Sequence, residues 1–415
     1  MAVPTVNVFI NFSTGPSFAA AAIIGSAVFG TNVFADSAGV IVDVSDQVDN
    51  IQIQRGRNAL TDTFQTGTLS LRIVDLTGAF NSQNTSSPYY GLLNPMRKIS
   101  ITATFGSTTY PLFAGYILGF NTSTPKNVGE VTYTTITAID GLRLLYNAQI
   151  TTVSGTSAGQ LSGARINNLL DQVSWPNSQR SIDAGQSTMQ ADPGVARTVL
   201  NACQVVATSE YGAFYIDASG NAVFKDRLTA SESIGGTATV FNDNGTGISY
   251  FNAFWLFNDD QIFNKAFITA SGLATQTATN SASVSKYFSH GYSQTDLLME
   301  DTDTALNYAR AYVASRAETT VRCDAITLDL YTDNYTTGTI AALDLDFFDP
   351  VTITTTQPAT VGTSTLTKTL QVFGVQHSIT VNSWKTTLVT LEPVIDAFLI
   401  GSSLYGIFDT SVLSY

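Results

Sequence analysis

The chain has 415 residues, of which 44% are hydrophobic and only 12% are charged. Soluble domains usually carry about 25% charged residues, so neutral polar side chains must cover most of this surface, and 57 residues are threonine. This composition excludes a disordered or collagen-like chain, and the length suits two to four domains. The formal net charge of −13 disfavours a role in reading DNA, because such proteins need a basic surface.

The N-terminal region is uncharged from Met1 to Ala35, and residues 18–30 are nearly all apolar or small. A signal peptide requires Lys or Arg before its apolar run, and neither residue precedes this one. The run is also shorter than the ~20 residues that span a bilayer. We therefore predict that residues 1–42 form an uncharged arm and a first strand that face an assembly partner, and we expect no membrane-spanning segment.

Short segments of alternating apolar and polar residues follow this arm. Such alternation, with β-branched and aromatic residues and with turn formers between the segments, predicts antiparallel strands. The strands are expected at residues 48–54, 68–74, 98–105 and 131–139. We therefore predict a first β-rich domain over residues 43–150.

The apolar period changes to that of a helix after residue 150. One amphipathic helix is expected between Leu161 and Val173, and a second from Val195 to Val206, opened by Asp192 as N-cap and Pro193 at the first helical position. A β-hairpin with an Asp and Gly turn should follow at residues 210–227. Residues 151–235 are therefore predicted to form a small α+β domain.

Strand signals return from about residue 237. They lie at residues 324–331, 351–355, 367–375 and 386–391, and one helix is expected near residues 304–318, with Asp301 and Asp303 at its start. We predict a second β-rich domain over residues 236–395 with one helix, then a docking segment at residues 396–415. The two β-rich domains are hypothesised to be distant duplicates.

The strongest catalytic pattern is a G-x-S-x-G sequence centred on Ser157. A nucleophile elbow of this kind belongs on a mainly parallel sheet, whereas the surrounding strands are predicted to be antiparallel. Its base would have to be His290 or His377, and nothing in the sequence places either one beside Ser157. We therefore interpret the pattern as a turn before a helix and predict no catalytic residue.

Metal and cofactor sites are not predicted either. Cys203 and Cys323 are isolated in the sequence, so the ligand spacing that is usual for a zinc site is missing. We expect both to be small buried thiols. Carboxylates cluster at several places, but no cluster follows the calcium-loop pattern. We expect no cofactor.

Basic residues are concentrated in one place within the first β-rich domain. Arg55, Gly56 and Arg57 lie at the end of a predicted strand and near several Asp residues. Two interpretations remain open, namely an ordinary surface ion-pair cluster and a contact between subunits or between domains.

An ordered set of short motifs in the first 120 residues resembles the minor tail proteins of siphophages, in particular the tail-tip and baseplate-hub group. The motifs are Asp43-Val-Ser45, Ile51 to Arg57, Phe64, Gly67 to Leu71, Asp75, Gly78, Phe80-Asn81, Ser87 to Gly91, Pro95 to Arg97 and Tyr110 to Gly115. Ser82 stands where the family pattern has Pro. The order continues downstream through Asp140-Gly-Leu142, Trp175-Pro176 and Trp384 to Pro393.

This resemblance implies a structural protein of the virion, located in the distal tail and assembled in the host cytoplasm. The implied fold is mainly β, with two tail-tube-like antiparallel β-barrel domains flanking a small α+β domain. The implied assembly is a ring at the end of the tube, with a trimer favoured over a hexamer. The other tail-tip, tail-tube, tape-measure and fibre proteins are the implied partners, and DNA passes only in transit.

The residues after 236 carry 7 basic and 17 acidic groups. We hypothesise that this charge lines the DNA channel of the ring, with Asp344, Asp346 and Asp349 as candidate lumen acids. Two alternatives to a hub remain. One is a distal-tail ring protein with a carbohydrate-binding module, and the other is a tail-associated cell-wall hydrolase.

Overall fold

A computed structural model describes residues 3–13, 15, 40–58, 63–123, 131–232, 236–331, 335–358 and 364–392. Most of the predicted N-terminal arm and the whole predicted docking segment at 396–415 lie outside these residues. No helix in the described parts of the chain is long and apolar enough to span a membrane.

The first part of the chain forms antiparallel strands, and those at residues 48–58, 63–74, 98–105 and 133–139 lie at or near the predicted positions, whereas the long strand at residues 108–123 was not predicted. Alternate side chains of β4, such as Leu69, Leu71 and Ile73, are buried while their neighbours are exposed, as a sheet with one covered face requires. We call these strands the N-terminal strand set: β1 (Thr5–Asn11), β2 (Ile41–Asp43), β3 (Val48–Asn58), β4 (Thr63–Val74), β5 (Lys98–Phe105), β6 (Thr108–Ser123) and β7 (Tyr133–Ile139).

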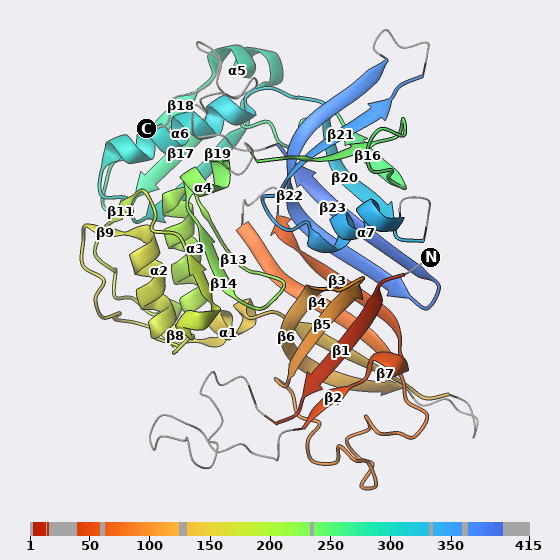
Figure 1. Ribbon diagram of the computed structural model, residues 1–415. Coiled ribbons are helices and arrows are strands. Elements are labelled where there is room, and N and C mark those ends of the chain that lie inside the picture. Colours follow the sequence, from red (N-terminus) through yellow and green to blue (C-terminus); the bar gives the residue numbers. More distant parts are fainter. Residues whose placement is uncertain are drawn as a thin grey trace.

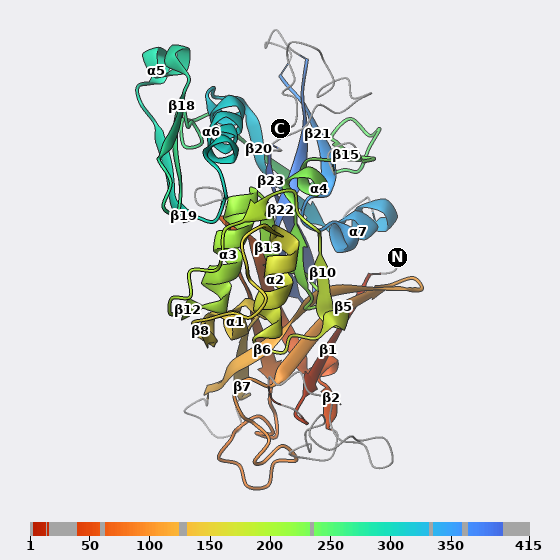
Figure 2. The ribbon, with the colours of Figure 1, turned by 90° about the vertical axis from the view of Figure 1, so that its left-hand side faces the viewer.

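The middle of the chain is an α+β unit with its own apolar core. Its main helices are α2 (Ser162–Asp171) and α3 (Val199–Glu210), and Figure 2 shows both in front of the strands. The shorter elements are α1 (Leu142–Asn147), β8 (Gln149–Ile150), β9 (Gln160–Leu161), β10 (Arg180–Ile182), β11 (Thr188–Met189), β12 (Arg197–Thr198), β13 (Ala213–Ile216), β14 (Ala222–Lys225) and α4 (Arg227–Glu232).

The predicted hairpin is confirmed as β13 and β14, but the predicted start of the second helix was wrong. Helix α3 begins at Val199, and its N-cap is Thr198, whose side chain accepts a hydrogen bond from Asn201 N at 3.0 Å. The carboxylate of Asp192 pairs with Arg197 instead. The later start of α3 results from a tertiary contact, because β12 pairs with β8 and this pairing keeps the two residues before Val199 extended.

The last part of the chain contains three helices in its described residues rather than the single predicted one. The predicted helix is confirmed as α6 (Thr302–Arg316), with Asp301 accepting from Thr304 N at 2.6 Å. The other two are α5 (Ser281–Tyr287) and α7 (Tyr335–Asp344). The sequence of α7 contains Gly and several Thr, which favour helices weakly, so its helix depends on burying Ala342 and Leu343.

The strands of this part belong to two different sheets. A small sheet with its own core is built from β17 (Lys265–Ala270), β18 (Gln276–Thr279) and β19 (Gly291–Leu297), and α6 packs on it. The others, which we call the C-terminal strand set, are β15 (Thr239–Asn242), β16 (Asn252–Leu256), β20 (Arg322–Asp329), β21 (Pro350–Thr356), β22 (Thr365–Thr380) and β23 (Ser383–Leu391).

The two strand sets form one thirteen-stranded sheet, because β22 pairs with β3 (Figure 1). The mainly β architecture with an α+β middle is therefore confirmed. Hydrogen bonds between the described strands do not close either set into a barrel. The C-terminal set does curl, since Tyr250 Oη and Trp255 Nε1 lie 2.8 and 3.0 Å from Thr355 Oγ1. Closed barrels stay a prediction.

Candidate functional site

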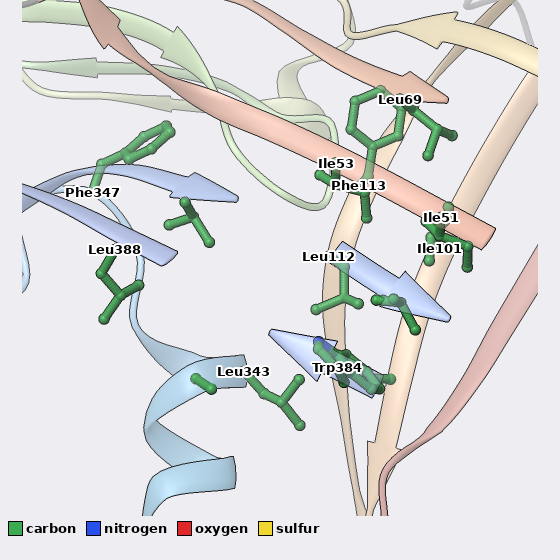
Figure 3. Packing of buried hydrophobic residues seen from close by; sticks show 14 of the residues in the cluster. Ile51, Ile53, Leu69, Ile101, Leu112, Phe113, Leu343, Phe347, Trp384 and Leu388 are labelled. Atoms are coloured by element: carbon green, nitrogen blue, oxygen red, sulfur yellow. The ribbon is translucent and has the colours of Figure 1, made fainter. Parts of the chain in front are cut away.

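The junction between the two strand sets is the candidate site. Residues 50–56 of β3 pair antiparallel with residues 374–380 of β22, and Gly56 lies opposite Gly374. We call this pairing the seam. A single apolar core runs beneath both sets, and Figure 3 shows Ile51 and Ile53 of β3 in the same cluster as Leu388 of β23.

Arg55 is the charged residue of the seam, and it lies next to the end at Gly56. Its side chain is only 5% exposed, and its guanidinium forms a bidentate ion pair with the carboxylate of Asp346. Nη2 lies 3.0 Å from Oδ1, and Nη1 lies 3.3 Å from Oδ2. The guanidinium also lies over the ring of Phe347, 5.0 Å from its centroid. Such paired and stacked geometry suits arginine and not lysine.

Arg57 lies over the ring of Phe373 at 5.1 Å, so both arginines of the predicted motif contact aromatic rings from the C-terminal part of the same chain. Gly56 allows the two backbones to approach between them. A contact of these residues with a second subunit stays a prediction.

An aromatic cluster joins the seam to the middle unit. Phe64 of β4 lies 4.8 Å from the ring of Tyr215 on β13 and 4.8 Å from that of Phe347, centroid to centroid. Phe348 and Phe373 complete the cluster, with centroids 5.2 Å apart. Three parts of the chain that are distant in sequence therefore meet around Arg55.

Two buried titratable groups lie near the same guanidinium. Burial raises the pKa of Asp140 to about 7, although backbone donors from Gly67 and Leu142 and the charge of Arg55 act in the opposite direction. Burial also lowers the pKa of His377 to about 3, and Arg55 lowers it further. The imidazole is therefore neutral at pH 7, with Nδ1 3.0 Å from Thr386 Oγ1.

Two of the three candidate lumen acids, Asp346 and Asp349, lie on the core side of the seam. Arg55 alternates along β3 with the exposed residue Gln54, so Asp346, its partner, lies on the opposite side of the sheet from Gln54. Asp349 accepts a hydrogen bond from Asp346 N at 2.9 Å, and burial raises its pKa. Asp344 is exposed at the end of α7. Their lumen role stays a prediction.

The other side of the sheet is open and polar across the seam. A hollow of about 530 Å³ lies there, and Lys385 is the one charged residue among those that line it. Gln52 Nε2 donates to Ser378 Oγ at 2.9 Å across the seam. We call this surface the polar face; its polar side chains are Gln52, Gln54, Thr68, Ser70, Thr137, Thr327, Gln376, Ser378, Lys385 and Thr387. The sequence indicated each alternation but not that the strands would combine into one surface.

The G-x-S-x-G pattern forms a turn and not a nucleophile elbow. The side chain of Arg165 is fully buried, and its Nη2 donates to the carbonyl oxygens of Ser157 and Gln190 at 3.1 and 2.7 Å. His377 is committed to Thr386, and Nε2 of His290 lies 3.1 Å from Tyr287 O. Neither imidazole bonds Ser157 in the described residues. The buried Arg165 carried no sequence signal of its own.

The thiols of Cys203 and Cys323 are free and buried, as expected. Burial raises the pKa of both, that of Cys323 to about 11. Among the described residues, no group of three or more His, Cys, Asp or Glu side chains is placed to hold a metal ion.

Known proteins were compared with the chain by sequence and by structure. No family model and no curated protein matches its sequence. Its structure is similar to that of a tail protein from Neisseria meningitidis, with a TM-score of 0.56 at 11% identity over 95% of this chain and 98% of that one. It is also similar to a 43 kDa prophage tail protein from Shewanella oneidensis, with a TM-score of 0.54 at 16% identity over 86% and 96% of the two chains. The chain therefore has a phage tail-protein fold, which confirms the resemblance at the level of the fold.

Proposed function

We propose that this chain is a structural hub of a long non-contractile phage tail, which joins the tail tube to the host-recognition apparatus. In this proposal several copies form a ring around a DNA channel, a trimer is the favoured ring, and each strand set corresponds to one tube-like barrel. The observation that carries the proposal is the seam, which combines two strand sets into one sheet with an open polar face, within a tail-protein fold.

The chemistry of the polar face supports a channel role. A duplex in transit must neither bind the wall nor be trapped by it, and phosphates bind mainly to Lys and Arg. Amide and hydroxyl side chains offer few fixed charges, and Lys385 is the single cation lining the hollow. A neutral polar wall therefore supports passage without retention.

The candidate lumen acids are a distinct hypothesis about the same channel. That hypothesis requires the α7 side of the sheet to face the DNA, whereas the polar-face hypothesis requires the opposite side to do so. Two double variants test these hypotheses. One carries Asp344→Asn and Asp349→Asn and removes the candidate lumen acids, and the other carries Gln54→Lys and Ser70→Lys and adds charge to the polar face. The pair that faces the channel is the pair that changes the rate of DNA ejection from assembled particles.

Packing at the seam supports a mechanical role. The paired Arg55 and Asp346, the aromatic cluster and the shared core join the two strand sets, and in this proposal they keep the angle between the sets constant. A ring closes only when every subunit has the same angle between its contact surfaces. Distal-tail position, attachment to the tube and contacts with tape-measure and fibre proteins belong to this proposal.

Native mass spectrometry combined with electron microscopy of the purified chain tests the proposal. We expect three copies arranged in a ring with a central opening, lined by the polar face. Six copies would favour a distal-tail ring protein over a hub. A monomer with no ring at any soluble concentration, together with absence of the protein from purified tails, would overturn the proposal.

A further inference from the structure

The same order of strands occurs twice in the large sheet. In the N-terminal strand set the order is β3-β4-β7-β6-β5-β1, and in the C-terminal strand set it is β16-β20-β23-β22-β21-β15. The first four pairings in each series are antiparallel, and β6 and β22 are both 16 residues long. The fifth pairing differs, because β1 joins β5 antiparallel whereas β15 joins β21 parallel.

Local irregularities also coincide. The register of β6 against β7 shifts just before Gly119, and that of β22 against β23 shifts just before Gly374. Met96 and Phe348 precede β5 and β21, and each has a positive φ, of 65° and 73°, which is unusual for residues other than Gly.

The backbone hydrogen bonds donated by Met96 and Phe348 also correspond between the two strand sets. Met96 N donates to Ile117 O at 2.6 Å, and Phe348 N donates to Val372 O at 2.8 Å. These acceptors each lie two residues before the equivalent glycines. The two strand sets are therefore equivalent around these positions, with Gly119 corresponding to Gly374.

This equivalence gives each half of the seam a counterpart. Residues 374–380 of β22 and residues 50–56 of β3 pair with each other in the seam. Their counterparts are the end of β6 from Gly119 onward, and β16. Within the described residues, the counterpart edges are unpaired: β5 covers β6 only up to residue 117, and β16 pairs only with β20.

The unpaired edges lack the charges that normally protect a sheet edge. Residues 119–123 read Gly-Phe-Asn-Thr-Ser and residues 252–256 read Asn-Ala-Phe-Trp-Leu. Phe254 is 53% exposed and Leu118 is 41% exposed. Soluble proteins often place charged side chains, especially Lys, on an open edge to prevent pairing with another chain. Neither of these edges carries a charged residue, which leaves both open to pairing. The register of β16 against β20 shifts between Phe254 and Trp255.

We propose that the end of β6 in one copy pairs antiparallel with β16 of a second copy and so repeats the seam between subunits. This inference rests on the proposed function, because it names the partner surface of the ring. Each chain carries one edge of each kind on different strand sets, so the contact is head-to-tail, and it builds a ring when the rotation between copies closes.

The register of the pairing follows from the equivalence. Ser70 and Ala325 are equivalent because they pair with Thr137 and Val389, which lie opposite the two equivalent glycines. Gln52 pairs with Ser70 and Phe254 pairs with Ala325, so Gln52 corresponds to Phe254. In the seam Gln52 lies opposite Ser378. Ser123, the counterpart of Ser378, therefore lies opposite Phe254 of the second copy.

Cross-linking of a double variant tests this register. In the chain carrying Ser123→Cys and Phe254→Cys, a short bis-maleimide should join copies, because directly opposed Cβ atoms lie about 5 Å apart. We expect covalent dimers and trimers on denaturing gels. The matched control is Thr109→Cys with Phe254→Cys, since Thr109 lies on the same strand but opposite Thr104 of β5. Both natural thiols are buried and should not react.

A charge on the edge tests the energetics. Phe254→Lys should weaken association between copies at least tenfold by native mass spectrometry and leave the thermal unfolding of the chain unchanged. Phe288→Lys is the control, because Phe288 is 82% exposed and lies outside both edges. A ring that forms without the Ser123 to Phe254 cross-link, or that resists Phe254→Lys, overturns this pairing and leaves the hub role standing. A chain that never associates counts against both.

Discussion

Gly56 on β3 lies opposite Gly374 on β22, and a Cβ atom added to Gly56 would lie 2.9 Å from the Cα atom of Gly374 and 3.1 Å from Phe373 O. Both neighbours are backbone atoms that cannot move aside as a flexible side chain would. The distance between the two strand sets is therefore set by two residues without side chains.

The first prediction concerns this contact. We expect Gly56→Ala to lower the free energy of unfolding by about 1–3 kcal/mol, because overpacking forces the strands apart. Urea unfolding followed by circular dichroism measures the change. Gly291→Ala is the matched control, since its added Cβ would meet only Phe267 at an ordinary 3.9 Å. Equal stability of the two variants would show that the seam can open without cost.

The second prediction compares two ion pairs. We expect Arg55→Met to destabilise the chain by about 2–4 kcal/mol, because it leaves Asp346 unpaired beside the core and removes the contact with Phe347. The same change at Arg72, which is 48% exposed and pairs with Asp49 at 2.7 Å, should cost at most about 1 kcal/mol. Chemical denaturation of both variants gives the comparison, and similar losses at the two sites would contradict it.

The third prediction concerns pH. The raised pKa of Asp140, about 7, makes the folded state hold a proton that the unfolded state loses above about pH 4. The contribution of Asp140 to the free energy of unfolding is therefore fully present below about pH 4 and is lost as pH rises through about 7. The lowered pKa of His377, about 3, has the opposite effect, since its stability is present above about pH 6.5 and is lost as pH falls through 3.

The two effects oppose each other between pH 4 and 6.5, so the wild-type stability should change little there through these groups. We expect His377→Gln to make stability fall with rising pH, and Asp140→Asn to make it rise, each by up to about 1.4 kcal/mol per pH unit relative to wild type. Urea titrations at pH 4.5, 5.5, 6.5 and 7.5 measure these slopes. Parallel curves for all three chains would refute the assignment.

The fourth prediction separates the turn at Ser157 from a hydrolase site. Ser157→Ala should change the free energy of unfolding by less than about 0.5 kcal/mol, and neither chain should release fragments from purified cell wall. Arg165→Met should destabilise the middle unit by about 2 kcal/mol or more, because it removes the donors to Ser157 O and Gln190 O. Cell-wall hydrolysis that is lost in Ser157→Ala would establish the enzyme instead.

Local sequence patterns predicted many strands of the large sheet, the hairpin of β13 and β14, and the position of α6, but they did not predict β6 or the small sheet of β17, β18 and β19. The alternation at residues 68–74 and 98–105 matches β4 and β5, and Asp301 caps α6 as its position indicated. These features depend on residues that lie within a few positions of each other, where side-chain direction and capping follow from backbone geometry.

Helix α7 and the start of α3 were not predictable in this way. The Thr-rich sequence of α7 favours a helix weakly, and its burial against the large core decides the conformation. Pairing of β12 with β8 delays α3 until Val199, although Asp192 and Pro193 form a sound local start signal.

The sequence by itself determined the mainly β character, the α+β middle and the low surface charge, because period and composition are local or summed properties. Only the tertiary structure decided that the two strand sets share one sheet, that Arg55 pairs with a residue 291 positions away, and that a neutral face crosses the seam. The physical reason is that backbone pairing between strand edges does not depend on side-chain identity. An edge that will pair with a distant strand therefore carries the same local pattern as one that will not.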